Sequence, residues 1–91
     1  MAGIVAIIVK VMPESPDIDV EGLKEEAEKA LKKEGAKNIS FEIKEMAFGL
    51  KALMIKFAWP EEKDSSVYED ALGKIEGVGS VNTEDYRRAF G

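Results

Sequence analysis

The chain has 91 residues, 45% of them hydrophobic, and contains neither cysteine nor histidine. This length fits one small domain over residues 1–91, and the missing residue types exclude disulfides, thiolate or imidazole metal sites and histidine- or cysteine-based catalysis. Thirteen basic against eighteen acidic side chains give a formal net charge of −5, which disfavours general binding to nucleic acids.

The first half of the chain has the pattern of a strand, a helix and a second strand. Residues 3–12 are β-branched and almost continuously apolar, which indicates a central strand. Apolar residues at helical spacing then predict an amphipathic helix that Asp17 or Asp19 caps at its start and Gly35 stops. Residues 37–45 alternate between apolar and polar side chains, as expected of a half-buried strand at the edge of a sheet.

The second half repeats this order with a shorter helix. Residues 50–59 form another run of β-prone residues that ends before a proline, which predicts a third strand. Ser66 and Glu69 have the spacing of a capping box, so we expect them to open a helix that closes near Gly77. Residues 78–88 are assigned to a final strand.

The order of these elements indicates an α+β fold, a ferredoxin-like βαββαβ sandwich with a four-stranded antiparallel sheet and two helices on one face. The two most apolar strands take the centre, which gives the strand order 4-1-3-2. If Val5, Ile7, Val9 and Val11 face the helices, the opposite face of the sheet has no helix to cover it. The apolar residues expected on this open face are Ile4, Ala6, Ile8, Met12, Leu50, Ala52 and Met54. Such a face either contacts a partner, which can be a second copy of the chain in a weak oligomer, or is partly covered by side chains or the C-terminal tail of the chain itself.

The sequence carries no pattern of catalytic or ligand-binding residues. Its carboxylates fall on predicted helix faces or in turns, and it has no glycine-rich phosphate loop, so we expect neither an enzyme nor a bound metal or cofactor. The predicted central strands lack the aromatic pattern on which RNA-recognition domains stack bases, so no direct nucleic-acid contact is expected. No apolar run approaches the length of a membrane span and no secretion signal is recognisable, which predicts a cytoplasmic protein without membrane contact.

Three local segments are candidates for function. The loop over residues 12–19 is stiff and acidic, although a capped connection from strand to helix is enough to explain it. Residues 46–50 lie at a predicted turn, where Phe48 is either a projecting apolar wedge or a side chain packed beneath the turn. Residues 85–88 carry an arginine pair on an acidic domain, for which surface salt bridges are the simpler interpretation.

Taken together, four segments resemble archaeal translation elongation factor 1-beta. They are residues 10–21 (KVMPESPDIDVE), 47–53 (AFGLKAL), 75–78 (IEGV) and 85–88 (DYRR), and they occur in the same order over the whole chain. Members of this family have the ferredoxin-like architecture and are guanine-nucleotide exchange factors for the GTPase elongation factor 1-alpha. The resemblance therefore implies an elongation factor that acts in protein biosynthesis.

The resemblance also implies which residues bind the partner. In the related eukaryotic exchange domain, the aromatic of a similar G-(Phe/Tyr)-G-(Ile/Leu) segment contacts the GTPase near its switch regions, and Phe48 followed by Gly49 matches it. That domain ends in a lysine that approaches the magnesium and phosphate site, whereas this chain has no lysine near its end and offers Arg87 and Arg88. The residues expected to bind the partner are Met46, Ala47, Phe48, Gly49, Arg87 and Arg88.

The implied mechanism is binding to the nucleotide-poor state of elongation factor 1-alpha, which disturbs its switch and magnesium region and promotes exchange of GDP for GTP. Two other classes of function stay open from the residues alone. A ferredoxin-like regulatory module that senses a small molecule or dimerises would use the apolar face of the sheet. A structural subunit of a translation complex would share the partner but not the exchange activity.

Overall fold

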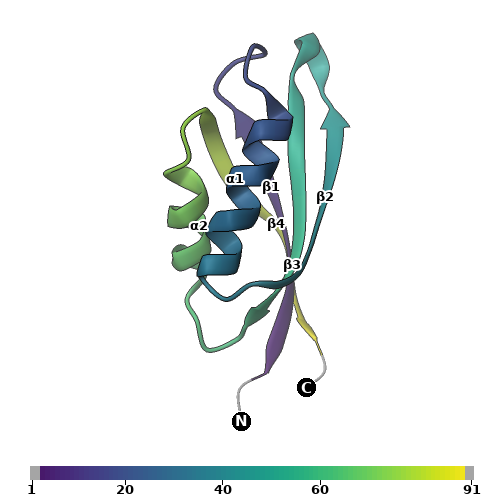
Figure 1. Cartoon of the computed structure of the whole chain (residues 1–91). Coiled ribbons are helices and arrows are strands. Elements are labelled where there is room, and N and C mark those ends of the chain that lie inside the picture. Colours follow the sequence, from purple (N-terminus) through teal and green to yellow (C-terminus); the bar gives the residue numbers. More distant parts are fainter. Residues whose placement is uncertain (1–2, 90–91) are drawn as a thin grey trace.

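Strands and helices alternate along the chain in the order that the sequence predicts (Figure 1). The computed structural model describes residues 3–89. The strands are β1 (Ile4–Pro13), β2 (Lys37–Glu45), β3 (Lys51–Pro60) and β4 (Val78–Ala89). The helices are α1 (Val20–Lys33), α2 (Ser65–Gly73) and the short 3₁₀ helix η1 (Ala47–Gly49).

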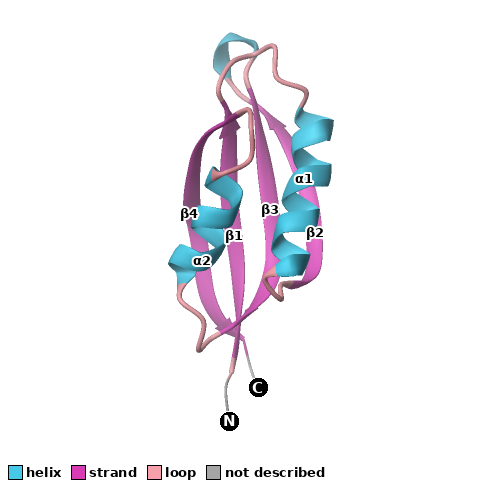
Figure 2. Cartoon of the chain, turned by 60° about the vertical axis from the view of Figure 1, so that its left-hand side comes forward, coloured by secondary structure: helices cyan, strands magenta, loops and turns pink. Residues whose placement is uncertain are grey.

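The four strands form one antiparallel sheet in the order β2-β3-β1-β4, as predicted. The helices α1 and α2 lie on the same face of this sheet (Figure 2). The continuously apolar strands β1 and β3 occupy the centre, where each has a neighbour on both sides. The architecture is therefore the ferredoxin-like sandwich, and the molecule is elongated, with extents of 44 × 21 × 18 Å. Within residues 3–89, no helix is long and apolar enough to cross a membrane.

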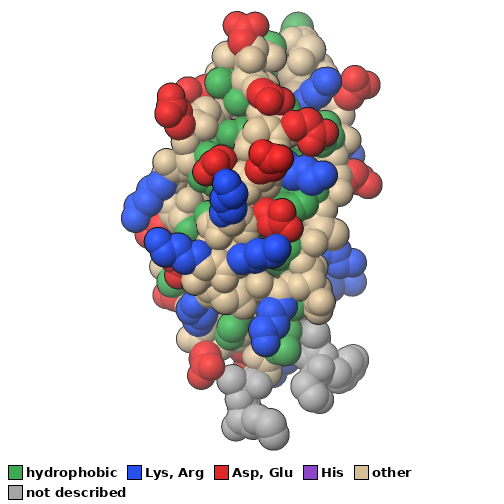
Figure 3. Space-filling view, viewed as in Figure 1, with side chains coloured by type: hydrophobic (Ala, Val, Ile, Leu, Met, Phe, Trp, Pro, Cys, Tyr) green, Lys and Arg blue, Asp and Glu red, His purple; other side chains and the backbone are tan. Residues whose placement is uncertain are grey.

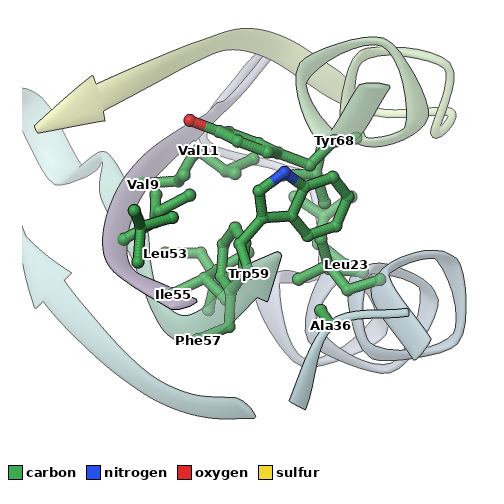
Figure 4. Close-up of a cluster of buried hydrophobic side chains, with 14 of the residues drawn as sticks. Val9, Val11, Leu23, Ala36, Leu53, Ile55, Phe57, Trp59 and Tyr68 are labelled. Carbon is green, nitrogen blue, oxygen red and sulfur yellow. The ribbon is translucent and has the colours of Figure 1, made fainter. Parts of the chain in front are cut away.

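The hydrophobic core lies between the sheet and the helices. Alternate residues of β1, Val5 to Val11, are at most 1% exposed, and the in-phase residues of β3 are equally buried. Three aromatic rings pack edge to face at the centre: Phe57 and Trp59 of β3 and Tyr68 of α2, with ring centroids 5.2 to 5.9 Å apart (Figure 4). The sequence pattern did not place Tyr68 in the core, yet its side chain is fully buried.

The buried hydroxyl of Tyr68 is satisfied by a polar contact with β4. Its oxygen lies 2.8 Å from Thr83 Oγ1, and Thr83 Oγ1 lies 3.2 Å from Glu69 Oε2, to which it donates. Burial raises the pKa of Tyr68 above its ordinary value, although the hydrogen bond with Thr83 opposes this shift. This contact joins α2 to the edge strand that it covers.

The predicted cap of α1 is confirmed, whereas that of α2 is wrong. Asp19 caps α1 by accepting a hydrogen bond from the backbone N–H two residues later, and Gly35 has the predicted left-handed conformation with a φ of 99°. In α2 the cap is Asp64, which accepts a hydrogen bond from the N–H of Ser66. Ser66 is already inside the helix, so it cannot form the expected capping box with Glu69.

The second helix also ends earlier than predicted. Its last residue is Gly73 and its C-cap is Lys74, so Gly77 lies in the following loop with a φ of 96°. The backbone of this loop then enters β4 beside β1. A Cβ atom on Gly79 would lie 3.0 Å from the carbonyl oxygen of Pro13, so a larger residue would require the backbone of Pro13 and Glu14 to shift by a few tenths of an ångström.

Both edge strands contain irregularities. In β2 the pairing with β3 shifts between Lys37 and Ser40, and the intervening Asn38 has a φ of 54°. In β4 the pairing with β1 contains two extra residues: Glu84, between the partners of Ile8 and Val9, and Gly79, between the partners of Met12 and Pro13. These are β-bulges, and each one increases the local twist of the edge.

Candidate functional site

The hairpin between β2 and β3 projects from one end of the molecule as an arm, here defined as residues 44–52 (Figure 1). β1 pairs with β3 only as far as Leu53, whereas β2 and β3 remain paired up to Glu45 and Lys51. The arm is therefore a two-stranded ribbon without a third strand to support it. Residues 42–49 are all exposed, which makes this the least covered segment of the sheet.

Phe48 lies at the tip of the arm and is 95% exposed. Its φ of 61° and ψ of 29° put it in the left-handed region, and Gly49 follows with a φ of 76°. A hydrogen bond of 2.7 Å from the Met46 N–H to the Leu50 carbonyl closes the turn. The alternative that Phe48 packs beneath the turn does not hold, and the ring projects as the wedge interpretation requires.

The position of Phe48 is energetically unfavourable in the free protein. A left-handed backbone costs a residue with a Cβ atom roughly 1 to 2 kcal/mol, and a solvated ring contributes almost no burial in return. Strained, exposed residues of this kind concentrate at functional sites. The tip of the arm is therefore the strongest candidate for a contact surface.

Two further exposed hydrophobic side chains accompany Phe48, one at the base of the arm and one near its tip. Ile43 and Met46 are each 38% exposed. The alternation of β2 predicts Ile43 in the core with Ile39 and Phe41, but only these two pack against it. The reason is position, because Ile43 pairs with Leu53, the last residue toward the arm at which β3 pairs with β1, and so lies at the margin of the three-stranded part of the sheet.

Two other loops meet at the same end of the molecule. The loop after β1 faces the base of the arm across a cavity of about 220 Å³, lined on one side by Pro16 and Ile18 and on the other by Ile43 and Lys51. This loop is joined to the α2–β4 loop by a 2.8 Å hydrogen bond from Glu14 N–H to the Gly77 carbonyl. Three of the four segments that carry the resemblance therefore gather at the arm.

Exposed carboxylates surround this end. They come from the loop after β1, the arm and the α2–β4 loop, and they are Glu14, Asp17, Glu45 and Glu76. In the view of Figure 3, acidic side chains concentrate toward the arm and basic side chains toward the opposite end. Phe48 is thus an apolar projection on an arm that carries Lys44 and Lys51, with carboxylates on the neighbouring loops.

Arg87 and Arg88 lie far from the arm. In the sheet they pair with Ala6 and Val5, near the start of β1, whereas the arm extends beyond the end of β1. The structure does not bring the two predicted groups of partner-binding residues together; they occupy opposite ends of the long axis (Figure 1).

Each arginine of this pair has a carboxylate partner in the chain. Arg87 Nε lies 3.0 Å from Asp85 Oδ2, and its side chain is 79% exposed. Arg88 binds Glu61 with two nitrogens, of which Nη2 lies 2.6 Å from Glu61 Oε1. The hydrogen bond from Arg88 lowers the pKa of Glu61. Both arginines thus form the surface salt bridges that were the simpler interpretation of this segment, but Glu61 was not identified from the sequence because it is distant from Arg88 along the chain.

The chain is similar to known proteins over nearly its whole length. The model of the EF-1 guanine nucleotide exchange domain matches residues 6–88. The chain is 44% identical over 91 residues to elongation factor 1-beta of Methanocella arvoryzae, covering 99% of this chain and all of the relative. It is 39% identical over 85 residues to elongation factor 1-beta of Halobacterium salinarum, covering 92% of this chain and 96% of the relative.

Fold, length and sequence identity point to the same assignment. The match to the domain model extends from β1 to the end of β4 and includes the arm. It supports a role in guanine-nucleotide exchange during translation elongation. The chain belongs to the family of EF-1 guanine nucleotide exchange domains.

Proposed function

We propose that the chain promotes exchange of GDP for GTP on elongation factor 1-alpha, and that Phe48 is the main anchor of the contact. The observation that supports this most directly is the 95% exposed, left-handed Phe48 at the tip of the arm. An aromatic side chain that enters an apolar pocket of a partner buries a large area at a small cost in side-chain entropy. The closed turn fixes the backbone of Phe48 before binding, so only the side-chain rotamer of the ring has to be ordered.

The proposed mechanism requires no covalent chemistry. A factor that binds the nucleotide-poor GTPase more tightly than the loaded form must, by linkage, weaken nucleotide binding by the same factor. Thousandfold faster release corresponds to a barrier lowered by about 4 kcal/mol. One central aromatic anchor typically supplies about 2 to 4 kcal/mol, so Phe48 together with a few neighbours is sufficient.

The arginine pair is assigned a secondary role. A partner that contacts both Phe48 and this pair must extend along the 44 Å axis of the molecule. Arg88 is held by two bonds to Glu61, which favours a role in fixing the end of β4. Arg87 is paired only with its near neighbour Asp85 and is more suited to contact the partner.

The test is stopped-flow release of a fluorescent guanine nucleotide from elongation factor 1-alpha, with and without the chain. Phe48→Ala should slow stimulated release by roughly 30-fold or more, because it removes the anchor. Phe48→Tyr, which keeps the ring, is the matched control and should retain most of the stimulation. If the wild-type chain does not accelerate release, the proposed exchange function is wrong.

A further inference from the structure

The open face of the sheet has a charge opposite to that of the rest of the chain. Alternation and register assign to it five of the thirteen basic side chains: Lys10, Lys37, Lys44, Lys56 and Arg87. They assign to it only two of the eighteen acidic ones, Glu42 and Asp85. Glu84 lies in the bulge of β4, where register gives it no face. A chain of net charge −5 thus presents one net basic surface.

The lysines on this face lack ion-pair partners in the described part of the chain. Arg87 and Asp85 pair with each other, but none of the four lysines forms an ion pair with a residue in the range 3–89. Lys56 lies on β3 between Met54 and Ala58, two residues from each. Lys10 of β1 is opposite Met54, and Lys37 of β2 is opposite Ala58. Lys56 is therefore a diagonal neighbour of Lys10 on one side and of Lys37 on the other, at a separation of about 7 Å in each pair. Like charges at this spacing repel each other, and register places one carboxylate among them, that of Glu42 opposite Met54, so the group keeps a net positive charge.

The same face is hollowed and partly apolar between the lysines. A depression of about 360 Å³ spans the three strands β1, β2 and β3. Ile8 and Met54 supply apolar side chains, while Ser40, Glu42, Lys44 and Lys56 form its polar margin. The open face also continues into the arm, because the pair formed by Lys44 of β2 and Ala52 of β3 belongs to the arm and lies on this face. A partner that holds the arm lies next to this surface.

We propose that the open face is a second contact surface for elongation factor 1-alpha and that it takes an acidic surface of that protein. This proposal rests on the proposed function. A second copy of the chain is a poorer occupant, because two such faces would oppose lysines to lysines. RNA is also a poorer occupant, because register assigns this face no aromatic side chain from residues 3–89 for base stacking and the chain is acidic overall.

The test compares two triple variants of equal charge. Lys10→Gln with Lys37→Gln and Lys56→Gln changes the open face. Lys29→Gln with Lys32→Gln and Lys33→Gln changes exposed positions of α1 on the helix side and lowers the net charge by the same three units. Association with elongation factor 1-alpha loaded with a fluorescent nucleotide is measured from about 50 to 300 mM NaCl.

The face variant should associate about tenfold more slowly at low salt, and the difference should shrink as salt rises. The α1 variant should associate at close to the wild-type rate. The melting temperature of the face variant should not fall, because it removes mutual repulsion and no internal ion pair. Equal slowing of both variants would show an effect of net charge alone and overturn the proposal, as would a wild-type rate for the face variant.

Further measurements distinguish the proposed partner from a second copy of the chain and from RNA, and they test the contact even if the exchange function is wrong. A dimer of the wild-type chain in sedimentation, lost in the face variant, would assign the face to self-association. Binding of a fluorescent single-stranded RNA that the face variant alone loses would assign it to nucleic acid. If wild type accelerates no nucleotide release, amide NMR shifts around Met54 on adding elongation factor 1-alpha still report the contact, and their absence would overturn it.

Discussion

Replacing Phe48 with asparagine should raise stability while it removes function. The ring is 95% exposed, so its burial contributes at most about 0.1 kcal/mol to folding. Its φ of 61° costs a bulky residue roughly 1 to 2 kcal/mol, and asparagine tolerates this conformation far better. We therefore expect Phe48→Asn to stabilise the fold by up to about 1 kcal/mol. For a domain of this size, that raises the melting temperature by roughly 4 to 8 °C.

The same substitution should reduce exchange strongly. Loss of a central aromatic anchor costs about 2 to 4 kcal/mol of binding to the nucleotide-poor GTPase. At 1.36 kcal/mol for each factor of ten, stimulated nucleotide release should fall by roughly 30- to 900-fold. Thermal unfolding and stopped-flow release are measured on the same preparation of Phe48→Asn, with Phe48→Tyr as the control that keeps the ring.

The opposite signs of the two effects make this test decisive. Most substitutions lower stability, so a loss of activity alone would not separate a contact residue from a structural one. A fall of several degrees in the melting temperature would mean that the ring packs against the protein. Release within twofold of wild type in a stable variant would mean that Phe48 is not the anchor.

Three other predictions concern the body of the domain. Lys63→Met removes a hydrogen bond to the end of α1 and a cation–π contact with Trp59, which should lower the melting temperature by about 4 to 8 °C and shift the tryptophan emission. Tyr68→Phe should cost about 1 kcal/mol in denaturant unfolding, because it leaves the hydrogen bond to β4 unmade. Burial raises the pKa of Tyr68, so the stability it contributes is complete below its ordinary pKa of 10.0 and is lost as pH rises through the higher folded value. The wild-type melting temperature should therefore fall more steeply above that pH than that of Tyr68→Phe. The hydrogen bond from Arg88 lowers the pKa of Glu61, so the stability that this pair contributes is present at neutral pH and is lost as pH falls from 4.5 through the lower folded value. Glu61→Gln should therefore flatten the fall of the melting temperature at acid pH. An unchanged dependence of the melting temperature on pH would contradict the pairing.

The sequence was most informative where hydrophobic periodicity determines the structure. The apolar run of β1 predicted a central strand, and its alternation predicted which side chains face the helices. The resemblance directed attention to Phe48, but its exposure depends on how far the hairpin extends past β1. Ile43 follows the same alternation as its partly buried neighbours Ile39 and Phe41 and is nevertheless exposed, since a periodic pattern does not show where the core ends.

Tertiary context explains the predictions that were wrong or incomplete. Asp64 and Ser66 are both good helix caps, and the structure uses the earlier one. Tyr68 carries a hydroxyl and was not assigned to the core, because its partner Thr83 is fifteen residues away in the sequence. The distance between the arm and Arg88 follows from the predicted topology, because antiparallel pairing puts the end of β4 beside the start of β1 and therefore opposite the β2–β3 turn.

The bulges in β2 and β4 have a consequence for the behaviour of the chain in concentrated solution. These strands are nine and twelve residues long, and each presents one row of backbone donors and acceptors without a neighbouring strand. Regular edges of this length are templates for pairing between molecules and for fibril growth. The left-handed Asn38 and the extra residue at Glu84 interrupt these rows, so a strand from another molecule can match neither edge over its whole length.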